Sequence, residues 1–434
     1  MKLVLKNATV LAADGAVQEA DIAIENGRIA AVGVLDEAAW QDAETRDCKG
    51  KLAMPGLVNA HTHAAMTLLR SYADDMNLMD WLEKKIWPVE AKMSRGDIYW
   101  GTQLAAAEML KSGTTAFADM YGDMDIVAQV VAETGMRASL ARGIIGVAPN
   151  GKQALEENKA LYTEYHGAAD GRITVMFGPH APYTCPPDFL KGVVAEAQKV
   201  GAEIHIHLAE TSGEVENCRK TYGKSPIALM EEAGVFECGV LAAHCVHISS
   251  GDLEIMKRRN VRVAHNPGSN MKLASGVAPV PEMLEAGICV ALGTDGASSN
   301  NNLDMFEEIH LAALLHKVDT LDPQVVPALT AVQMATENGA RALGISDAVG
   351  KIEAGKRADI VLLDMQRLNW CPRHDVVSLL AYATNAAQVD TVLVDGKVLL
   401  DGGKLTTIDE ERVLFEAQKR ALRLAESAGG EAHA

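Results

Sequence analysis

The strongest constraint on the fold of this chain is a regular alternation of short apolar segments with amphipathic helical segments over about 300 residues. The helical segments, such as DFLKGVVAEAQKVG, end at a glycine, as is typical of a helix C-cap. Eight strand–helix units in series predict an α/β fold, a (β/α)8 TIM-like barrel. The core strands are predicted at 54–61, 115–119, 138–145, 173–179, 203–209, 240–245, 261–265 and 288–294.

The two ends of the chain have a different pattern. ADIAIENGRIAAVG near the start and VDTVLVDGKVLLDGGKL near the end alternate apolar and polar residues around ENG and DG turns, as β-hairpins do. We therefore expect 1–55 and 356–434 to form a small β-sandwich domain and 56–355 to form the barrel. Apolar i, i+4 spacing predicts a surface helix at 408–427, which we assign to the small domain.

Composition narrows the class of protein. A formal net charge of −18 disfavours a nucleic-acid partner, because that function needs a basic surface. We find no leader peptide and no uninterrupted apolar run of about 18 residues, so we expect a cytoplasmic protein without a membrane partner. Seven cysteines without a CxxC pair predict mostly buried, reduced thiols.

Many of the histidines lie at the predicted carboxyl ends of the barrel strands. Polar residues at the carboxyl ends of barrel strands are the catalytic candidates. The predicted strand ends carry His61, His63, Asp119, Arg142, His180, His207, His244, His265 and Asp295.

The segment MPGLVNAHTHAAM predicts part of a metal site. Residues i and i+2 of a strand point to the same face, so His61 and His63 can reach one ion. An HxH pair alone is a weak signal, but AEIHIHLAET adds His207 and CVALGTDGASSNN adds Asp295. Three imidazoles and a carboxylate suit one divalent ion, Zn²⁺ or Fe²⁺, with a position left for water. We interpret His205, deeper in its strand, as a core or supporting residue.

Taken together, HxH, HxxE, HC and TDG at successive strand ends resemble the amidohydrolase superfamily. The strand RITVMFGPH and its neighbours offer no lysine to bridge two metals, so the mononuclear branch, rich in deaminases, fits better. HTHAAMTLLRSYADDMNLMDWLEKKIWPVEAKM, RASLARGI, FGPHAPYTC and GTDGASSNNNLDM narrow the resemblance to 5′-methylthioadenosine/S-adenosylhomocysteine deaminases.

The resemblance implies a role for each site residue. The metal ligands would be His61, His63, His207 and Asp295. Glu90 would contact the ribose hydroxyls, His180 the nucleoside, Glu210 the purine ring and Arg142 the sulfur-bearing tail. The family often has a second arginine where this chain has Gln153 and Ala154, which weakens the case for S-adenosylhomocysteine.

The chemistry of adenine deamination adds catalytic roles. Glu210 would donate a proton to the ring nitrogen, Asp295 would move a proton from water to the leaving amine, and His244 would stabilise the intermediate. Structural alternatives are a turn-capping Asp295, a solvated Glu210 and a core His244. The segment 64–95 is long and rich in Met, Leu and Trp, so we expect it to cover the barrel mouth.

Other functions remain open at this stage. The same superfamily hydrolyses chlorinated or aminated triazines, and guanine or cytosine deaminases are a further alternative. An inactive metal-binding scaffold is a non-enzymatic alternative. The family tendency suggests a homo-oligomer.

Overall fold

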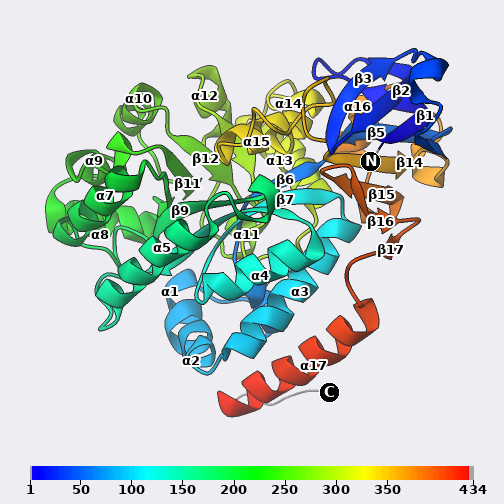
Figure 1. Cartoon of the computed structure of the whole chain (residues 1–434). Helices are drawn as coiled ribbons and strands as arrows, with labels where there is room; N and C mark the ends of the chain where they lie inside the picture. The colour runs from blue at the N-terminus through cyan, green and yellow to red at the C-terminus, as the bar shows by residue number, and fades with distance from the viewer. Residues whose placement is uncertain (1, 430–434) are drawn as a thin grey trace.

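The computed structural model describes residues 2–429 and contains two β-sheets, one from the middle of the chain and one from its two ends (Figure 1). The first is an eight-stranded parallel sheet in which each strand lies beside its neighbour in the sequence. The predicted barrel-like α/β fold is confirmed. Its strands are β6 (Leu57–Thr62), β7 (Thr114–Tyr121), β8 (Arg137–Ile144), β9 (Ile173–Pro179), β10 (Ile204–Leu208), β11 (Val240–His244), β12 (Arg262–His265) and β13 (Val290–Leu292).

Helices follow the strands and lie around this sheet (Figure 1). The connection after β6 is the longest irregular one and contains the 3-10 helix η2 (Ala64–Leu69), α1 (Leu78–Trp81), the π-helical turn η3 (Leu82–Ile86) and α2 (Trp87–Glu90). The other helices are α3 (Arg95–Lys111), α4 (Met124–Thr134), α5 (Gly151–Tyr165), α6 (Ala168–Gly171), α7 (Pro187–Val200), α8 (Ser212–Tyr222), α9 (Pro226–Glu232), α10 (Ser250–Arg258), α11 (Pro267–Lys272), α12 (Val280–Glu285), α13 (Met305–Thr320), α14 (Ala328–Met334) and α15 (Glu337–Ala342).

Hydrogen bonds join the first and last strands of the barrel. The Asp295 N–H donates to the His61 carbonyl at 2.9 Å, and the Thr294 N–H donates to Asn59 Oδ1 at 3.0 Å. A Cβ atom on Gly293 would lie 2.8 Å from the His61 nitrogen, so only glycine allows this approach. The closure brings Asp295 beside the HxH pair, although more than 200 residues separate them in the sequence.

The second sheet combines both ends of the chain, as predicted. It has nine strands, and it curls so that the Ile29 N–H donates to the Lys356 carbonyl at 2.8 Å. The curled sheet encloses its own apolar core, which includes Leu5, Ile22 and Ile360. Its strands are β1 (Lys2–Leu11), β2 (Val17–Glu25), β3 (Arg28–Gly33), β4 (Glu44–Asp47), β5 (Lys51–Pro55), β14 (Ile360–Asp364), β15 (Val389–Val394), β16 (Lys397–Asp401) and β17 (Lys404–Leu405).

The C-terminal helix α17 (Glu410–Ser427) is present where the sequence predicted a helix, and it packs along α3 of the barrel (Figure 1). Arg420 bonds to the buried Asp97 at 3.1 Å at one end of α3, and Lys111 bonds to Glu410 at 2.6 Å at the other. Leu424 is fully buried against apolar side chains of the 64–95 segment. The C-terminal helix therefore supports the long connection after β6. The shorter α16 (Val376–Tyr382) packs on α13 and α14.

Two further sequence expectations can be compared with residues 2–429. No helix in that range combines the length and apolar character that crossing a membrane requires. The seven cysteines are free thiols, and all except Cys371 are buried, as predicted.

Candidate metal centre and active site

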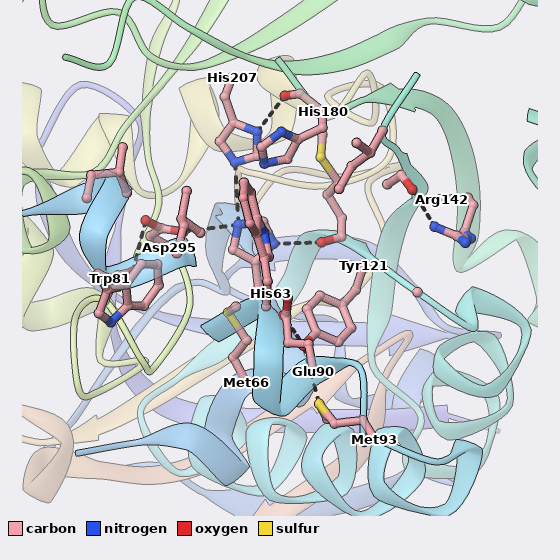
Figure 2. Close-up of a pocket in the computed structure, with 18 of the residues that line it drawn as sticks. His63, Met66, Trp81, Glu90, Met93, Tyr121, Arg142, His180, His207 and Asp295 are labelled. Carbon is pink, nitrogen blue, oxygen red and sulfur yellow. Dashed lines mark hydrogen bonds and ion pairs between the residues drawn. The ribbon is translucent and has the colours of Figure 1, made fainter. Parts of the chain in front are cut away.

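The four predicted ligands meet at the carboxyl end of the barrel. Figure 2 shows three of them, His63, His207 and Asp295. His61 lies near the end of β6 with His63 directly after it, His207 lies on β10, and Asp295 follows β13. Asp295 Oδ1 is 3.4 Å from His61 Nε2 and 3.2 Å from His63 Nε2. His207 Nε2 is 3.4 Å from His63 Nε2. Four potential donor atoms therefore face one point.

Hydrogen bonds on the far side of each ring fix which nitrogen faces that point. His63 Nδ1 donates to the Met120 carbonyl at 2.6 Å, and His207 Nδ1 donates to the His180 carbonyl at 2.7 Å. A ring whose Nδ1 carries the proton presents an unprotonated Nε2, as a metal ligand requires.

His61 provides the clearest test of whether an ion fits. Its Nδ1 lies 2.9 Å from His205 Nε2, while its Nε2 is buried and has no hydrogen-bond partner among the described residues. Unpaired buried polar atoms are rare because desolvation is costly. A divalent cation among these four residues would satisfy the nitrogen, so the donor set fits a metal ion.

Asp295 is held from both sides. The hydroxyls of Ser269 and Ser299 donate to Oδ2 at 2.7 and 2.9 Å, and the Gly296 N–H donates to Oδ1 at 2.8 Å. Asp295 adopts a left-handed backbone conformation, with φ of 62°, which turns its carboxylate toward the histidines. These contacts leave Oδ1 directed at the centre.

Burial and the Asp295 charge set the protonation of the histidines. Burial lowers the pKa of His61 to about 4 and holds the pKa of His207 well below its usual value. Burial also opposes charge on His63, but hydrogen bonding to Asp295 raises the pKa of His63 to about 9. The neighbouring imidazoles of His61 and His63 overcome burial and keep the pKa of Asp295 well below its usual range. A metal ion would replace the proton on His63.

His244 and Glu210 flank this centre. His244 Nδ1 lies 2.8 Å from Asn270 Oδ1, and its Nε2 lies 3.8 Å from Glu210 Oε2. His61, His244 and Asp295 also form a set whose candidate ligand atoms lie within 4.8 Å of one another. Burial raises the pKa of Glu210, which favours its protonated form.

The centre opens into a cavity of about 490 Å³. As predicted, the 64–95 segment forms one of its walls, through Met66, Leu78, Trp81 and Trp87. Three other apolar residues of the segment do not line the cavity. Met79 is 45% exposed, and Leu68 and Leu69 belong to the buried apolar cluster that includes Leu424 of α17.

Glu90 and His180 both line the cavity (Figure 2). The Tyr121 hydroxyl donates to Glu90, and burial raises the pKa of that carboxyl. His180 Nδ1 lies 2.9 Å from Thr184 Oγ1, and burial lowers the pKa of His180 to about 3. The cavity therefore presents a carboxyl group and a neutral imidazole, and the centroid of the His180 ring lies 4.9 Å from that of His207.

Arg142 lines the cavity, but its side chain already has protein partners. Its Nε donates to Glu157 at 2.8 Å, and its Nη1 donates to the Gly143 carbonyl. Gln153 donates to the other oxygen of Glu157 at 2.9 Å. Arg142 and Gln153 therefore share one carboxylate.

Several site residues were not singled out from the sequence. Tyr121, Tyr183 and Ser299 line the cavity, while Ser269 and Ser299 hold Asp295. The run TDGASSNN contained a signal for Ser299, because it places this serine just beyond Asp295. Ser269 lies 26 residues before Asp295, and no local pattern links the two.

Two further polar residues at the predicted strand ends, Asp119 and His265, have protein partners. Asp119 Oδ1 accepts the Ala64 N–H at 2.7 Å, and His265 Nε2 lies 3.2 Å from His316 Nε2. They support the backbone and core around the centre.

Comparison with known families decides the classification. The model of the amidohydrolase family matches residues 52–399, which is most of the chain. The chain belongs to the amidohydrolase family. Relatives within this family extend the match over nearly the whole length. A 5-methylthioadenosine/S-adenosylhomocysteine deaminase of Pelotomaculum thermopropionicum is 54% identical over 97% of this chain and 98% of its own. The narrower resemblance inferred from the sequence is confirmed.

Other proteins are similar to this chain at different levels. A 5′-deoxyadenosine deaminase of Methanosarcina acetivorans is 50% identical over 97% of this chain and 98% of its own. The crystal structure of an adenosine deaminase from Xanthomonas campestris with bound zinc has a TM-score of 0.93 at 36% identity, over 98% of each chain. An atrazine chlorohydrolase of Arthrobacter aurescens has a TM-score of 0.89 at 24% identity, over 96% of this chain and 100% of its own, which shows a common fold alone.

Proposed function

We propose that this protein is a metal-dependent hydrolase that deaminates adenosine-type nucleosides to their inosine analogues and ammonia. The substrates are 5′-methylthioadenosine, S-adenosylhomocysteine and adenosine. The observation that carries the proposal is one cavity that is lined by His63, His207 and Asp295 of the metal centre and also by Glu210 and Glu90. The deaminase names of relatives about 50% identical support the same chemistry.

We assign the metal to the four donors whose atoms face one point, and zinc is the proposed ion. The unpaired His61 Nε2 and the zinc in the structural neighbour from Xanthomonas campestris support this choice. When bound, such an ion lowers the pKa of water toward about 7 and supplies a nucleophile at neutral pH.

The protein groups then move the protons. Glu210, whose pKa burial raises, donates a proton to the purine ring nitrogen beside the carbon that water attacks. Asp295 accepts a proton from the attacking water and delivers it to the departing amine. His244 stabilises the charge that develops during attack, and Asn270 orients its ring. The hydroxyl proton of the intermediate passes to Glu210 as the carbonyl forms, so Glu210 regains its proton, one water is consumed and one ammonia is released.

Glu90 and His180 give the site its preference for a nucleoside. Glu90 accepts hydrogen bonds from the ribose hydroxyls, and His180 contacts the nucleoside. The wall of Met66, Leu78, Trp81 and Trp87 takes an apolar thioether substituent. Arg142 contacts the tail of S-adenosylhomocysteine, but this requires its guanidinium to exchange Glu157 for the ligand. We therefore expect 5′-methylthioadenosine to be the better substrate.

Turnover by the zinc-loaded protein tests this function. Adenosine, 5′-methylthioadenosine and S-adenosylhomocysteine should each show the ultraviolet shift of adenine-to-hypoxanthine conversion, together with one equivalent of ammonia. Guanine, cytosine and a chlorotriazine are the comparison substrates, because they lack the adenosine ribose that Glu90 would bind. Turnover of a comparison substrate without turnover of any adenosine compound would overturn the proposal.

We also propose the domain boundaries, the cellular location and the assembly of the protein. The domains are 1–55 with 356–434 and 56–355, and the protein is a cytoplasmic homo-oligomer. The apolar core that the curled sheet encloses supports the division, while other side chains of that sheet, such as Leu52 and Val361, pack into the core of the barrel. Light scattering coupled to size-exclusion chromatography tests the assembly, and a single-chain mass would contradict it.

A further inference from the structure

Glu214 is a buried carboxylate near the active site that the proposed chemistry does not use. It lies in the first turn of α8 and is 9% exposed. Its two oxygens accept two consecutive backbone N–H groups, from Ala209 at 2.9 Å and from Glu210 at 2.8 Å. Both oxygens of this side chain are therefore bonded to the turn that presents Glu210.

These contacts differ from an ordinary helix cap. In a capping box, the carboxylate at the third helical position bonds to the N–H of the N-cap residue, here Thr211. The Thr211 hydroxyl already accepts the Glu214 N–H at 3.1 Å, so α8 has its own cap. The Glu214 side chain reaches past Thr211 to the two residues before it.

The turn that Glu214 holds has a backbone conformation that needs support. Ala209 has φ of 51°, in the left-handed region, which is strained for a residue other than glycine. On the other side of the same turn, the Ala209 carbonyl accepts the His247 N–H at 2.9 Å. The direction of the Glu210 side chain follows from this turn, because Glu210 is the next residue.

Charge couples the two carboxyl groups as well. Burial and the neighbouring Glu210 charge raise the pKa of Glu214 to about 7, although the hydrogen bonds from the two backbone N–H groups act to lower it. Tyr183 lies in the field of both groups, since burial and the charges of Glu210 and Glu214 raise the pKa of its phenol well above 10. Negative charge on either carboxylate therefore favours a proton on the other.

We propose that Glu214 is a positioning residue that holds Glu210 against the substrate ring through the Ala209 and Glu210 amides. The inference rests on the proposed role of Glu210 in deamination. Glu214 does not touch the substrate, because it acts through the backbone of the turn.

Glu214→Gln tests the proposal with 5′-methylthioadenosine as substrate. Glutamine has nearly the same size, but its amide offers one acceptor oxygen and places an NH₂ group against the second N–H. We expect kcat to fall about 10- to 100-fold, as for a small displacement of a catalytic group, with KM changed less than about twofold. Zinc content and melting temperature should stay close to those of Glu216→Gln, a matched change on the exposed face of α8.

A double-mutant cycle separates positioning from a general structural role. If Glu214 acts through Glu210, adding Glu214→Gln to Glu210→Gln should lower kcat by less than about twofold. An equal loss of kcat in both backgrounds would overturn the proposal. If Glu214→Gln fails to fold, Glu214→Asp replaces it, since the shorter side chain keeps the charge but cannot reach both amides.

The same measurements distinguish a failure of the proposed function from a failure of the positioning role of Glu214. A zinc-loaded wild type that deaminates no adenosine compound would overturn both the proposed function and the role of Glu214. A wild type that does so, with unchanged kcat in Glu214→Gln, would overturn the positioning role alone.

Discussion

The metal centre and the apolar wall of the cavity are built in different ways. His61, His207 and Asp295 lie at or beside barrel-strand ends, are almost fully buried, and each have a second polar contact that fixes the side chain. The wall of Met66, Leu78, Trp81 and Trp87 comes from a long irregular connection supported by α17. On the proposed function, the chemistry therefore depends on the barrel, whereas the fit of an apolar thioether substituent depends on a segment held by distant packing.

The largest expected effect falls on the metal-centre side. Asp295→Asn removes a proposed ligand charge and the proton carrier together, so kcat should fall by roughly 10³-fold or more. Steady-state kinetics and zinc analysis by plasma mass spectrometry measure both losses. A variant with near-normal turnover would show that Asp295 only caps its turn.

The next prediction concerns the support under His61. His205→Phe keeps an aromatic ring but removes the Nε2 atom that lies 2.9 Å from His61 Nδ1. Loss of such an outer hydrogen bond should weaken zinc binding about 10- to 100-fold. Competition with a coloured chelator measures the affinity. His316→Phe, at a buried histidine outside the centre, is the control and should leave zinc affinity unchanged.

A substitution at Glu90 tests whether this residue binds the ribose of the substrate. Glu90→Gln should raise KM for 5′-methylthioadenosine about 10- to 100-fold, since a hydrogen bond to a charged group contributes roughly 1.5–3 kcal/mol. Metal content should not change. Adenine, which has no ribose, is the internal control, and an equal loss on adenine and the nucleoside would contradict a ribose contact.

The smallest effect is expected from the support of the wall. Arg420→Ala removes one of the bonds between α17 and the buried Asp97. This partly exposed ion pair contributes about 1 kcal/mol or less, so KM for 5′-methylthioadenosine should rise up to about fivefold while kcat stays unchanged. Lys419→Ala, an exposed change on the same helix, is the control. A fall in kcat without a rise in KM would place the effect of α17 at the metal centre instead.

The sequence by itself determined the barrel, the two-ended β-sheet and the meeting of His61, His63, His207 and Asp295. Strand alternation and helix periodicity are local signals, and parallel strand ends share one edge of a barrel, so residues far apart in the chain could be placed together. The order of the eight strands and the position of the C-terminal helix in the chain followed from the same patterns.

Only the tertiary structure decided the supporting contacts. The bonds of Tyr121 to Glu90, Ser269 to Asp295, Arg142 to Glu157 and Glu214 to the turn at Ala209 depend on side-chain directions that no periodicity encodes. The same holds for α17, whose amphipathic pattern predicted a helix but not its packing partner. An apolar face specifies that it is buried, whereas the surface that buries it depends on the complete fold.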